Sequence, residues 1–354
     1  MGFDRISAFG LTYFPISVIK NPTMRTLATT AFSMLDLVPV QLGGSVAQAL
    51  HNSLDMARHV EQLGFTRYWL AEHHNMDGIA SSATAVLIGH VAGGTSRIRV
   101  GSGGIMLPNH APLVVAEAFG TLATLYPDRI DLGLGRAPGT DPHTMRALRR
   151  DRPETADDFP RQVLELQALL APPVPGQRLI AMPGAGTEVP IWLLGSSLFS
   201  AQLAGQLGLP YAFASHFAPR FMMDAIRMYR EQFRPSAVLD KPYVAIGVPV
   251  IAAPDDAEAQ FLATTTYQRI LSLLRGERLA QRPPVASMDG LWSEQERAGV
   301  EAFLAIGVVG GPETIRRGLD RLLAQTEVDE FIFVSDLYDH DKRRRSLEIV
   351  NSVR

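Results

Sequence analysis

Short apolar runs alternate with amphipathic segments along most of this chain. Eight runs have the length and composition of buried strands: 33–40, 67–71, 97–104, 129–135, 191–196, 211–215, 243–253 and 330–335. The stretches between them carry apolar residues at helical spacing, and we expect helices over 45–64, 81–92, 111–127, 158–170, 198–207, 218–233, 256–275 and 312–324. Because a parallel strand needs a crossover before its neighbour, this alternation predicts a parallel sheet covered by helices.

Eight strand–helix units in a chain of 354 residues predict an α/β fold, specifically a (β/α)8 TIM barrel. A doubly wound open sheet is the alternative on the pattern alone. Segments 136–157 and 276–311 are too long for ordinary loops and are rich in Pro, Gly, Arg and Asp. We therefore expect long βα insertions that build or cover a site at one end of the barrel.

The expected domain organisation is one barrel over residues 33–354 with a flexible N-terminal extension over residues 1–32. Pro15 and Pro22 interrupt the apolar character of the extension, and Met24 offers a second start. A signal peptide with a weak "ATTA" cleavage signal is the alternative interpretation. No stretch approaches the roughly 20 apolar residues that a transmembrane helix needs.

Charge and cysteine content exclude several functional classes. The net charge is −3, so the chain lacks the excess of positive charge that is typical of proteins that bind nucleic acid or an anionic membrane. The absence of cysteine excludes disulfides, thiolate metal sites and a cysteine nucleophile, and it fits a reducing compartment, so we expect a cytoplasmic protein. The run DKRRR at 341–345 is interpreted as solvated charge.

The sequence EHHN at 72–75 follows the second predicted strand directly. Barrel active sites lie at the carboxyl ends of the strands, and a histidine moves protons near neutral pH, so we expect Glu72, His73 and His74 at a catalytic centre. An ordinary hydrogen-bonded turn is the alternative. A zinc site is disfavoured, and we expect no metal, because neighbouring residues on a strand point to opposite faces. Weaker candidates for lining the site are His110, His143 and His216.

The third predicted strand ends in a glycine-rich sequence, VGSGG. Gly103 and Gly104 weaken a strand interior, which indicates that a ligand or another backbone approaches closely. A Gly-Gly pair also has the smallest steric penalty for a non-proline cis peptide, which costs about 2.5–4 kcal/mol. A glycine bend at a barrel corner is the alternative.

The fourth and fifth strands lead into residues suited to an anion. Arg136 follows the fourth strand and offers a fixed charge with a bidentate donor fork, although a surface ion pair would use the same residue. The fifth strand enters a predicted helix whose free N–H groups attract anions, and serine is also a common N-cap there. One phosphate can bridge these adjacent strand ends. The residues around this helix start are Gly195, Ser196, Ser197 and Ser200.

Four blocks of sequence strongly resemble one family. They read SMLDLVPV, LGFTRYWLAEHHN, RIRVGSGGIMLPNHAPLVVAEAFGTLATLYPDRIDLGLGRAPG and IWLLGSSLFSAQLAGQLGLPYAFASHF. The chain resembles the bacterial luciferase-like flavin-dependent oxidoreductases over about residues 33–350, and among them the single-chain members rather than the light-emitting heterodimer. The resemblance implies a (β/α)8 barrel, usually dimeric.

The resemblance also implies roles for particular residues. His73 matches the active-site histidine beside the flavin, and Gly103–Gly104 matches a non-prolyl cis peptide packed against the isoalloxazine. Arg136 matches a phosphate-binding arginine, and the turn at 195–200 matches the one that holds the same phosphate. One departure is Gly135, where the luciferase α chain has a reactive cysteine, and this departure argues against luminescence.

The function implied by the resemblance is an FMN-dependent monooxygenase. Reduced FMN would act as cosubstrate, and O2 would add at its C4a position to form a peroxyflavin that oxidises a small organic substrate. A separate NAD(P)H:flavin reductase and a second copy of the chain are the expected partners. The alternatives are hydride transfer with a deazaflavin coenzyme and a flavin-binding protein without turnover. Phe, Met and Trp within 286–303 fit an apolar substrate pocket or an ordinary lid.

Overall fold

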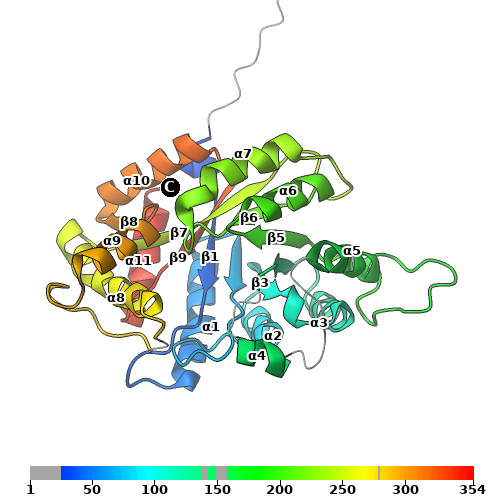
Figure 1. Ribbon diagram of the computed structural model, residues 1–354, viewed down its shortest axis with the longest axis horizontal. Helices are drawn as coiled ribbons and strands as arrows, with labels where there is room; N and C mark the ends of the chain where they lie inside the picture. The colour runs from blue at the N-terminus through cyan, green and yellow to red at the C-terminus, as the bar shows by residue number, and fades with distance from the viewer. Residues whose placement is uncertain (1–24, 138–141, 149–157, 278–279) are drawn as a thin grey trace, which may run out of the picture.

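The computed structural model describes residues 25–137, 142–148, 158–277 and 280–354 (Figure 1). Within these ranges, nine strands form one sheet in which all strand pairings are parallel. Their bounds are β1 Ala31–Asp36, β2 Arg67–Leu70, β3 Arg99–Met106, β4 Ile130–Gly135, β5 Ile191–Gly195, β6 Tyr211–Phe213, β7 Val244–Ala252, β8 Val308–Gly310 and β9 Glu330–Val334.

The sheet closes on itself to form a barrel. Strands β1 to β6 pair in sequence order, β6 pairs with β7, β7 with β9, and β9 with β1. The short strand β8 lies outside this ring and pairs only with β7. This closure confirms the predicted (β/α)8 barrel and excludes the open doubly wound sheet.

Helices surround the strands, which occupy the centre of the molecule in Figure 1. The eight predicted helices are confirmed, with ends that shift by a few residues because caps rather than periodicity set them. Among the described residues, no helix is long and apolar enough to cross a membrane. The confirmed helices are α1 Val46–Gln62, α2 Thr84–Gly94, α3 Pro112–Leu125, α5 Phe159–Leu170, α6 Leu198–Leu207, α7 Met222–Gln232, α8 Asp256–Leu274 and α10 Pro312–Thr326.

Three further helices were not predicted. Helix α4 Pro142–Leu148 and helix α9 Glu294–Phe303 lie in the two segments that were interpreted as irregular insertions. Helix α11 His340–Ser352 contains the DKRRR run, and the interpretation of that run as solvated charge is wrong for Arg343. The Arg343 side chain is buried, and its Nη2 donates to Oδ1 of Asp36 at the end of β1 over 2.8 Å.

The start of the barrel also differs from the prediction. Strand β1 begins at Ala31, and Phe32 is fully buried in the core. Leu27, in the short 3-10 helix η1 Leu27–Thr29 that precedes β1, is also buried. Residues 25–32 therefore pack with the barrel, and the first strand begins earlier than predicted. The remainder of the predicted extension, including Met24, lies outside the described residues.

Side chains fill the barrel interior at the amino ends of the strands. Arg67 donates from Nη1 to Asp131 and from Nε to Glu330, each over 2.7 Å, and both carboxylates are buried. The Arg67 guanidinium also lies 4.5 Å from the Trp192 ring centroid, and Trp192 packs edge-on against Trp69. This half of the barrel is a packed core, so a ligand site must lie at the carboxyl ends of the strands.

Candidate active site

The predicted site residues lie at the carboxyl ends of four consecutive strands of the ring. Residues 72–74 follow β2, Arg136 follows β4, and Gly195 ends β5. Gly103 and Gly104 lie within β3, between β2 and β4. The closed barrel therefore gathers at one end the groups that the sequence placed at separate strand ends.

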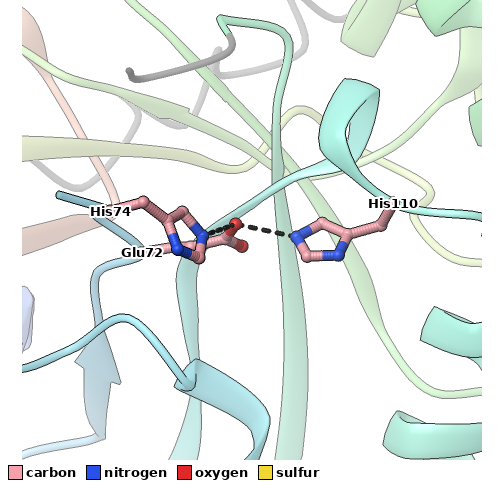
Figure 2. A group of neighbouring side chains, drawn as sticks. All are labelled: Glu72, His74 and His110. Atoms are coloured by element: carbon pink, nitrogen blue, oxygen red, sulfur yellow. Dashed lines mark hydrogen bonds and ion pairs between the residues drawn. The ribbon is translucent and has the colours of Figure 1, made fainter. Parts of the chain in front are cut away.

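Glu72 is the centre of a buried hydrogen-bonded group (Figure 2). Its Oε1 accepts from Nε2 of His74 over 2.8 Å and from Nε2 of His110 over 2.7 Å. Its Oε2 accepts from the Met106 backbone N–H over 3.1 Å. The Glu72 side chain is only 1% exposed, whereas the two histidines are partly exposed. A single carboxylate therefore orients both rings and joins the ends of β2 and β3.

The hydrogen bonds determine the ionisation of this group. Burial alone would raise the pKa of Glu72, but the bonds from His110, His74 and the Met106 N–H outweigh burial and hold the pKa below its ordinary value. Glu72 is therefore ionised at neutral pH. Each histidine must carry a proton on Nε2 to donate to it.

The expectation that Glu72 and His74 act at the reacting atoms stays a prediction. In the structure, Oε1 of Glu72 is engaged with both His74 and His110. Ligand atoms of the three residues lie within 4.8 Å of one another, close enough to be considered as a metal site. Both histidines, however, direct Nε2 to the same carboxylate oxygen at hydrogen-bond distance, and a bound metal would have to replace both bonds.

The Gly103–Gly104 peptide bond is cis, as the resemblance predicted. A Cβ on Gly103 would lie 2.6 Å from Cδ1 of Leu35, and a Cβ on Gly104 would lie 2.7 Å from the carbonyl oxygen of Gly133. The pairing of β3 with β4 also shifts register here. The glycines are therefore required by the close approach of neighbouring strands. The sequence analysis offered this approach of another backbone as one reason for the glycines and the approach of a ligand as the other.

Arg136 lies against the first turn of α6. Its guanidinium carbon is 4.3 Å from the centroid of the Phe199 ring. Among the described residues, no carboxylate forms an ion pair with Arg136. Within the described residues, the alternative interpretation of Arg136 as a surface ion pair therefore finds no support, and its cation lies at the positive end of α6.

The serine turn leaves the start of α6 available to an anion. Ser197 is the N-cap residue, in an extended conformation, and its side chain makes no capping hydrogen bond. Ser200 is buried and its Oγ donates to the Ser197 carbonyl over 3.2 Å. A Cβ on Gly195 would lie 2.0 Å from Oγ and 2.8 Å from Cβ of Ser200, so only glycine allows this packing. Ser196 is half-buried in the same turn.

Of the remaining histidines, His216 is the one that the structure brings into the site. His73 is partly exposed after β2, and its backbone N–H donates to the Ser81 carbonyl over 3.4 Å. His216 follows β6, and burial, together with the nearby charges of Arg269 and His73, lowers its pKa to about 4 despite the opposing effect of Asp336. The His216 ring occupies the space that a side chain on Gly247 of β7 would fill, since a Cβ there would lie 2.1 Å from Nδ1. His143 is exposed on α4.

A cavity of about 630 Å³ lies beside His216. It is bounded by β7, β8 and the end of β9, and by helices α8 and α9, which lie side by side in Figure 1. Met288, Trp292 and Phe303 line it, so the apolar residues of segment 286–303 do form a pocket wall. Arg269 and Asp336 also line the cavity and were not singled out from the sequence, because nothing local to either residue indicates the other.

A closed parallel barrel with ionisable groups at the carboxyl ends of its strands is the architecture of a barrel enzyme. A family model described as luciferase-like monooxygenase matches residues 30–330, and the chain belongs to this family of oxidoreductases. The predicted family is therefore confirmed. The chain is 54% identical to the uncharacterized protein YvbT of Bacillus subtilis, covering 92% of this chain and 96% of YvbT. It is 51% identical to a luciferase-like monooxygenase of Escherichia coli, covering 92% and 97%.

Solved structures share the fold. Apo-MsnO8 superimposes with a TM-score of 0.82 at 35% identity, covering 92% of this chain and 98% of that one. The oxygenating constituent of 3,6-diketocamphane monooxygenase of Pseudomonas putida, in complex with FMN, has a TM-score of 0.68 at 18% identity, covering 91% and 97%. An F420-dependent secondary alcohol dehydrogenase has a TM-score of 0.65 at 14% identity, covering 92% and 99%.

Proposed function

We propose that this chain is a monooxygenase that uses reduced FMN and O2 to oxidise a small organic molecule. The observation that carries the proposal is the Arg136 guanidinium, which has no carboxylate partner among the described residues and lies beside the first turn of α6, where Ser197 makes no side-chain cap. A cation and free helix N–H groups together form a site for a phosphate. The ends of β4 and β5 would hold the FMN phosphate through Arg136, Ser197 and Ser200.

The residues at the carboxyl end of β3 fit the rest of a flavin. The cis Gly103–Gly104 peptide carries no side chain, so it offers a flat backbone surface between β2 and the phosphate site. When bound, reduced flavin supplies the electrons that activate dioxygen, and the protein supplies position and surroundings. His73 would hold or move a proton at a ring nitrogen. Glu72 would act one step further away, by fixing the loops on which His74 and His110 lie.

FMN is preferred to the deazaflavin coenzyme on the names of the relatives. The 51% identical protein of Escherichia coli is named a monooxygenase, and the FMN complex of the diketocamphane enzyme shares the fold. The F420-dependent dehydrogenase shares the fold too, so hydride transfer with a deazaflavin is the second candidate function.

We propose two protein partners. A separate NAD(P)H:flavin reductase would supply reduced FMN, because the proposed reaction consumes reduced FMN as a cosubstrate. A second copy of the chain would cover neighbouring helices α2 and α3, where the apolar side chains of Val86, Val114 and Leu125 are 72%, 58% and 63% exposed.

A flavin titration of the parent chain and the Arg136→Ala variant tests the proposal. Visible absorbance and flavin fluorescence would be followed with FMN, riboflavin and the deazaflavin coenzyme, each oxidised and reduced. Loss of a charge-assisted hydrogen bond costs about 1.5–3 kcal/mol, so Arg136→Ala should weaken FMN binding roughly 10- to 150-fold. Riboflavin lacks the phosphate and is the matched control, since its binding should not change.

Turnover separates a catalytic flavoprotein from a flavin carrier. The His73→Ala variant should bind FMN like the parent and lose oxygen-dependent product formation in a coupled assay with a flavin reductase. If the parent binds FMN and riboflavin equally well, the phosphate site is wrong. Preference for the deazaflavin would transfer the proposal to hydride transfer.

A further inference from the structure

The cavity beside His216 has walls that are apolar over most of their area. Val250 of β7, Ile270 of α8 and Val300 of α9 are buried and line it together with Trp292 and Phe303. Its volume of about 630 Å³ lies within the usual range for sites that enclose small organic ligands. The hydrophobic effect would therefore favour a ligand with an apolar body.

The charged groups of the cavity are paired within its own wall. Arg269 Nη2 of α8 lies 2.5 Å from Oδ2 of Asp336, which follows β9, and Asp336 is buried. Arg297 Nε of α9 lies 2.8 Å from Oε1 of Glu301. Asp289, exposed at the rim, adds a negative charge. Each cation that an anionic ligand could use already has a carboxylate partner, so the wall is neutral to slightly negative.

Two residues of the cavity wall each have a buried polar atom without a hydrogen-bond partner among the described residues. Arg269 Nε and His216 Nδ1 belong to residues that line the cavity, both atoms are buried, and neither has a hydrogen-bond partner among the described residues. Buried polar atoms are nearly always satisfied in folded proteins. A ligand with an oxygen acceptor would accept from Arg269 Nε without displacing Asp336.

We propose that this cavity binds the substrate, and that the substrate is a neutral molecule with an apolar ring or chain and a carbonyl-type oxygen. The oxygen lies at Arg269 and His216, and the apolar body lies against Trp292 and Phe303. Asp336 acts as a specificity residue, because its carboxylate neutralises Arg269 and repels anionic analogues. The identification of the ligand as substrate rests on the proposed function, since His216 brings the cavity next to His73.

Binding can be measured without flavin by tryptophan fluorescence. The chain has three tryptophans, of which Trp69 and Trp192 are buried in the barrel and Trp292 lines the cavity. The probes are 2-acetylnaphthalene, a neutral ketone, and 2-naphthoate, an anion of nearly equal shape. The ketone should quench fluorescence saturably and bind at least about tenfold more tightly than the anion, and Trp292→Phe should remove the quenching.

A charge variant tests the role of Asp336, and a filling variant tests the location. Asp336→Asn frees Arg269, so it should tighten 2-naphthoate binding about tenfold and change ketone binding less than about threefold. Val309→Phe fills the cavity and should weaken ketone binding about tenfold or more. Val174→Phe, at an exposed position that does not line the cavity, is the matched control and should leave ketone binding unchanged. Should Asp336→Asn not fold, Arg269→Gln tests the same pair, because removal of Nε should weaken ketone binding.

Three results would overturn the inference: equal binding of the two probes by the parent, an equal effect of Asp336→Asn on both, or normal ketone binding by Val309→Phe. All are obtained on flavin-free protein, so they leave the proposed function standing. Conversely, suppose that Arg136→Ala binds FMN as tightly as the parent while the parent still binds the ketone more tightly than the anion. That result would refute the proposed phosphate site and leave the cavity as a site for neutral ligands.

Discussion

Replacement of His216 by asparagine should remove a defined part of the pH dependence of stability. The His216 ring is enclosed by Gly247 of β7 and by the Arg269–Asp336 pair, and His73 lies near enough to affect its charge. Burial disfavours the imidazolium, and the pKa falls from an ordinary value of 6.5 to about 4. Asparagine retains a polar group in the position of Nδ1 and does not titrate.

The size and sign of the effect follow from linkage between proton binding and unfolding. Between pH 6.5 and about 4 the unfolded chain binds a proton at His216 and the folded chain does not. The free energy of unfolding of the parent therefore falls with decreasing pH by up to about 1.4 kcal/mol per unit from this residue, about 3 kcal/mol over the window. This contribution to stability is fully present above pH 6.5 and is absent below pH 4.

Urea unfolding of the parent and His216→Asn, at several pH values between 7.5 and 4.5 and at constant ionic strength, would measure the effect. The parent should lose stability relative to the variant steadily as the pH falls. His51→Asn, at an exposed position on α1, controls for removal of any histidine. A difference between parent and His216→Asn that stays constant over this pH range would show that His216 is not held neutral in the folded chain.

The buried carboxylates of Glu72 and Asp36 give further predictions. Glu72→Gln should lower the free energy of unfolding at pH 7 by about 1–3 kcal/mol, because the Met106 N–H and two histidine donors lose a charged acceptor. Since the Glu72 pKa is depressed, this difference should vanish as the pH falls through the folded pKa, and a difference that persists in acid would contradict the assignment. Arg343→Met should cost about 3–5 kcal/mol in thermal or urea unfolding by leaving Asp36 buried and unpaired. The double variant with Asp36→Asn should be less destabilised than the sum, and strict additivity would disprove the coupling.

The barrel could be predicted because each of its strands is apolar over its own length and is followed by a local helical pattern. Helices α9 and α11 were not predicted, because they depend on signals other than apolar periodicity. Helix α9 begins with a capping box, in which Ser293 accepts from the Glu296 N–H and Glu296 accepts from the Ser293 N–H, and the S-x-x-E spacing is visible in the sequence. Helix α11 was missed because its charged residues mask a buried face. The burial of Arg343 depends on Asp36, 307 positions away.

Some features of the candidate site could likewise be predicted from the sequence, and others could not. The convergence of Arg136 with the serine turn follows from strand order alone, because β4 and β5 are neighbours in any barrel of this sequence. The position of Glu72 between His74 and His110 could not be predicted in this way. The sequence places Glu72 and His73 side by side after the same strand and does not distinguish their roles. The Arg269–Asp336 pair joins α8, which follows β7, to the end of β9, and the pairing of β7 with β9 brings these elements together.

The buried Asp36–Arg343 pair also bears on how the chain is made. Asp36 lies at the end of the first strand, whereas Arg343 is translated only after all strands of the ring. A ribosome that has synthesised β1 through β7 carries a curved sheet with two unsatisfied edges, because the partner of both edges, β9, is still missing. Long-range pairing of this kind is slow, and exposed edges invite association with other chains. Both edges stay unpaired until β9 has left the exit tunnel, and the Asp36–Arg343 pair forms later still. We therefore expect copies that stall or terminate before β9 to be substrates for chaperones and proteases.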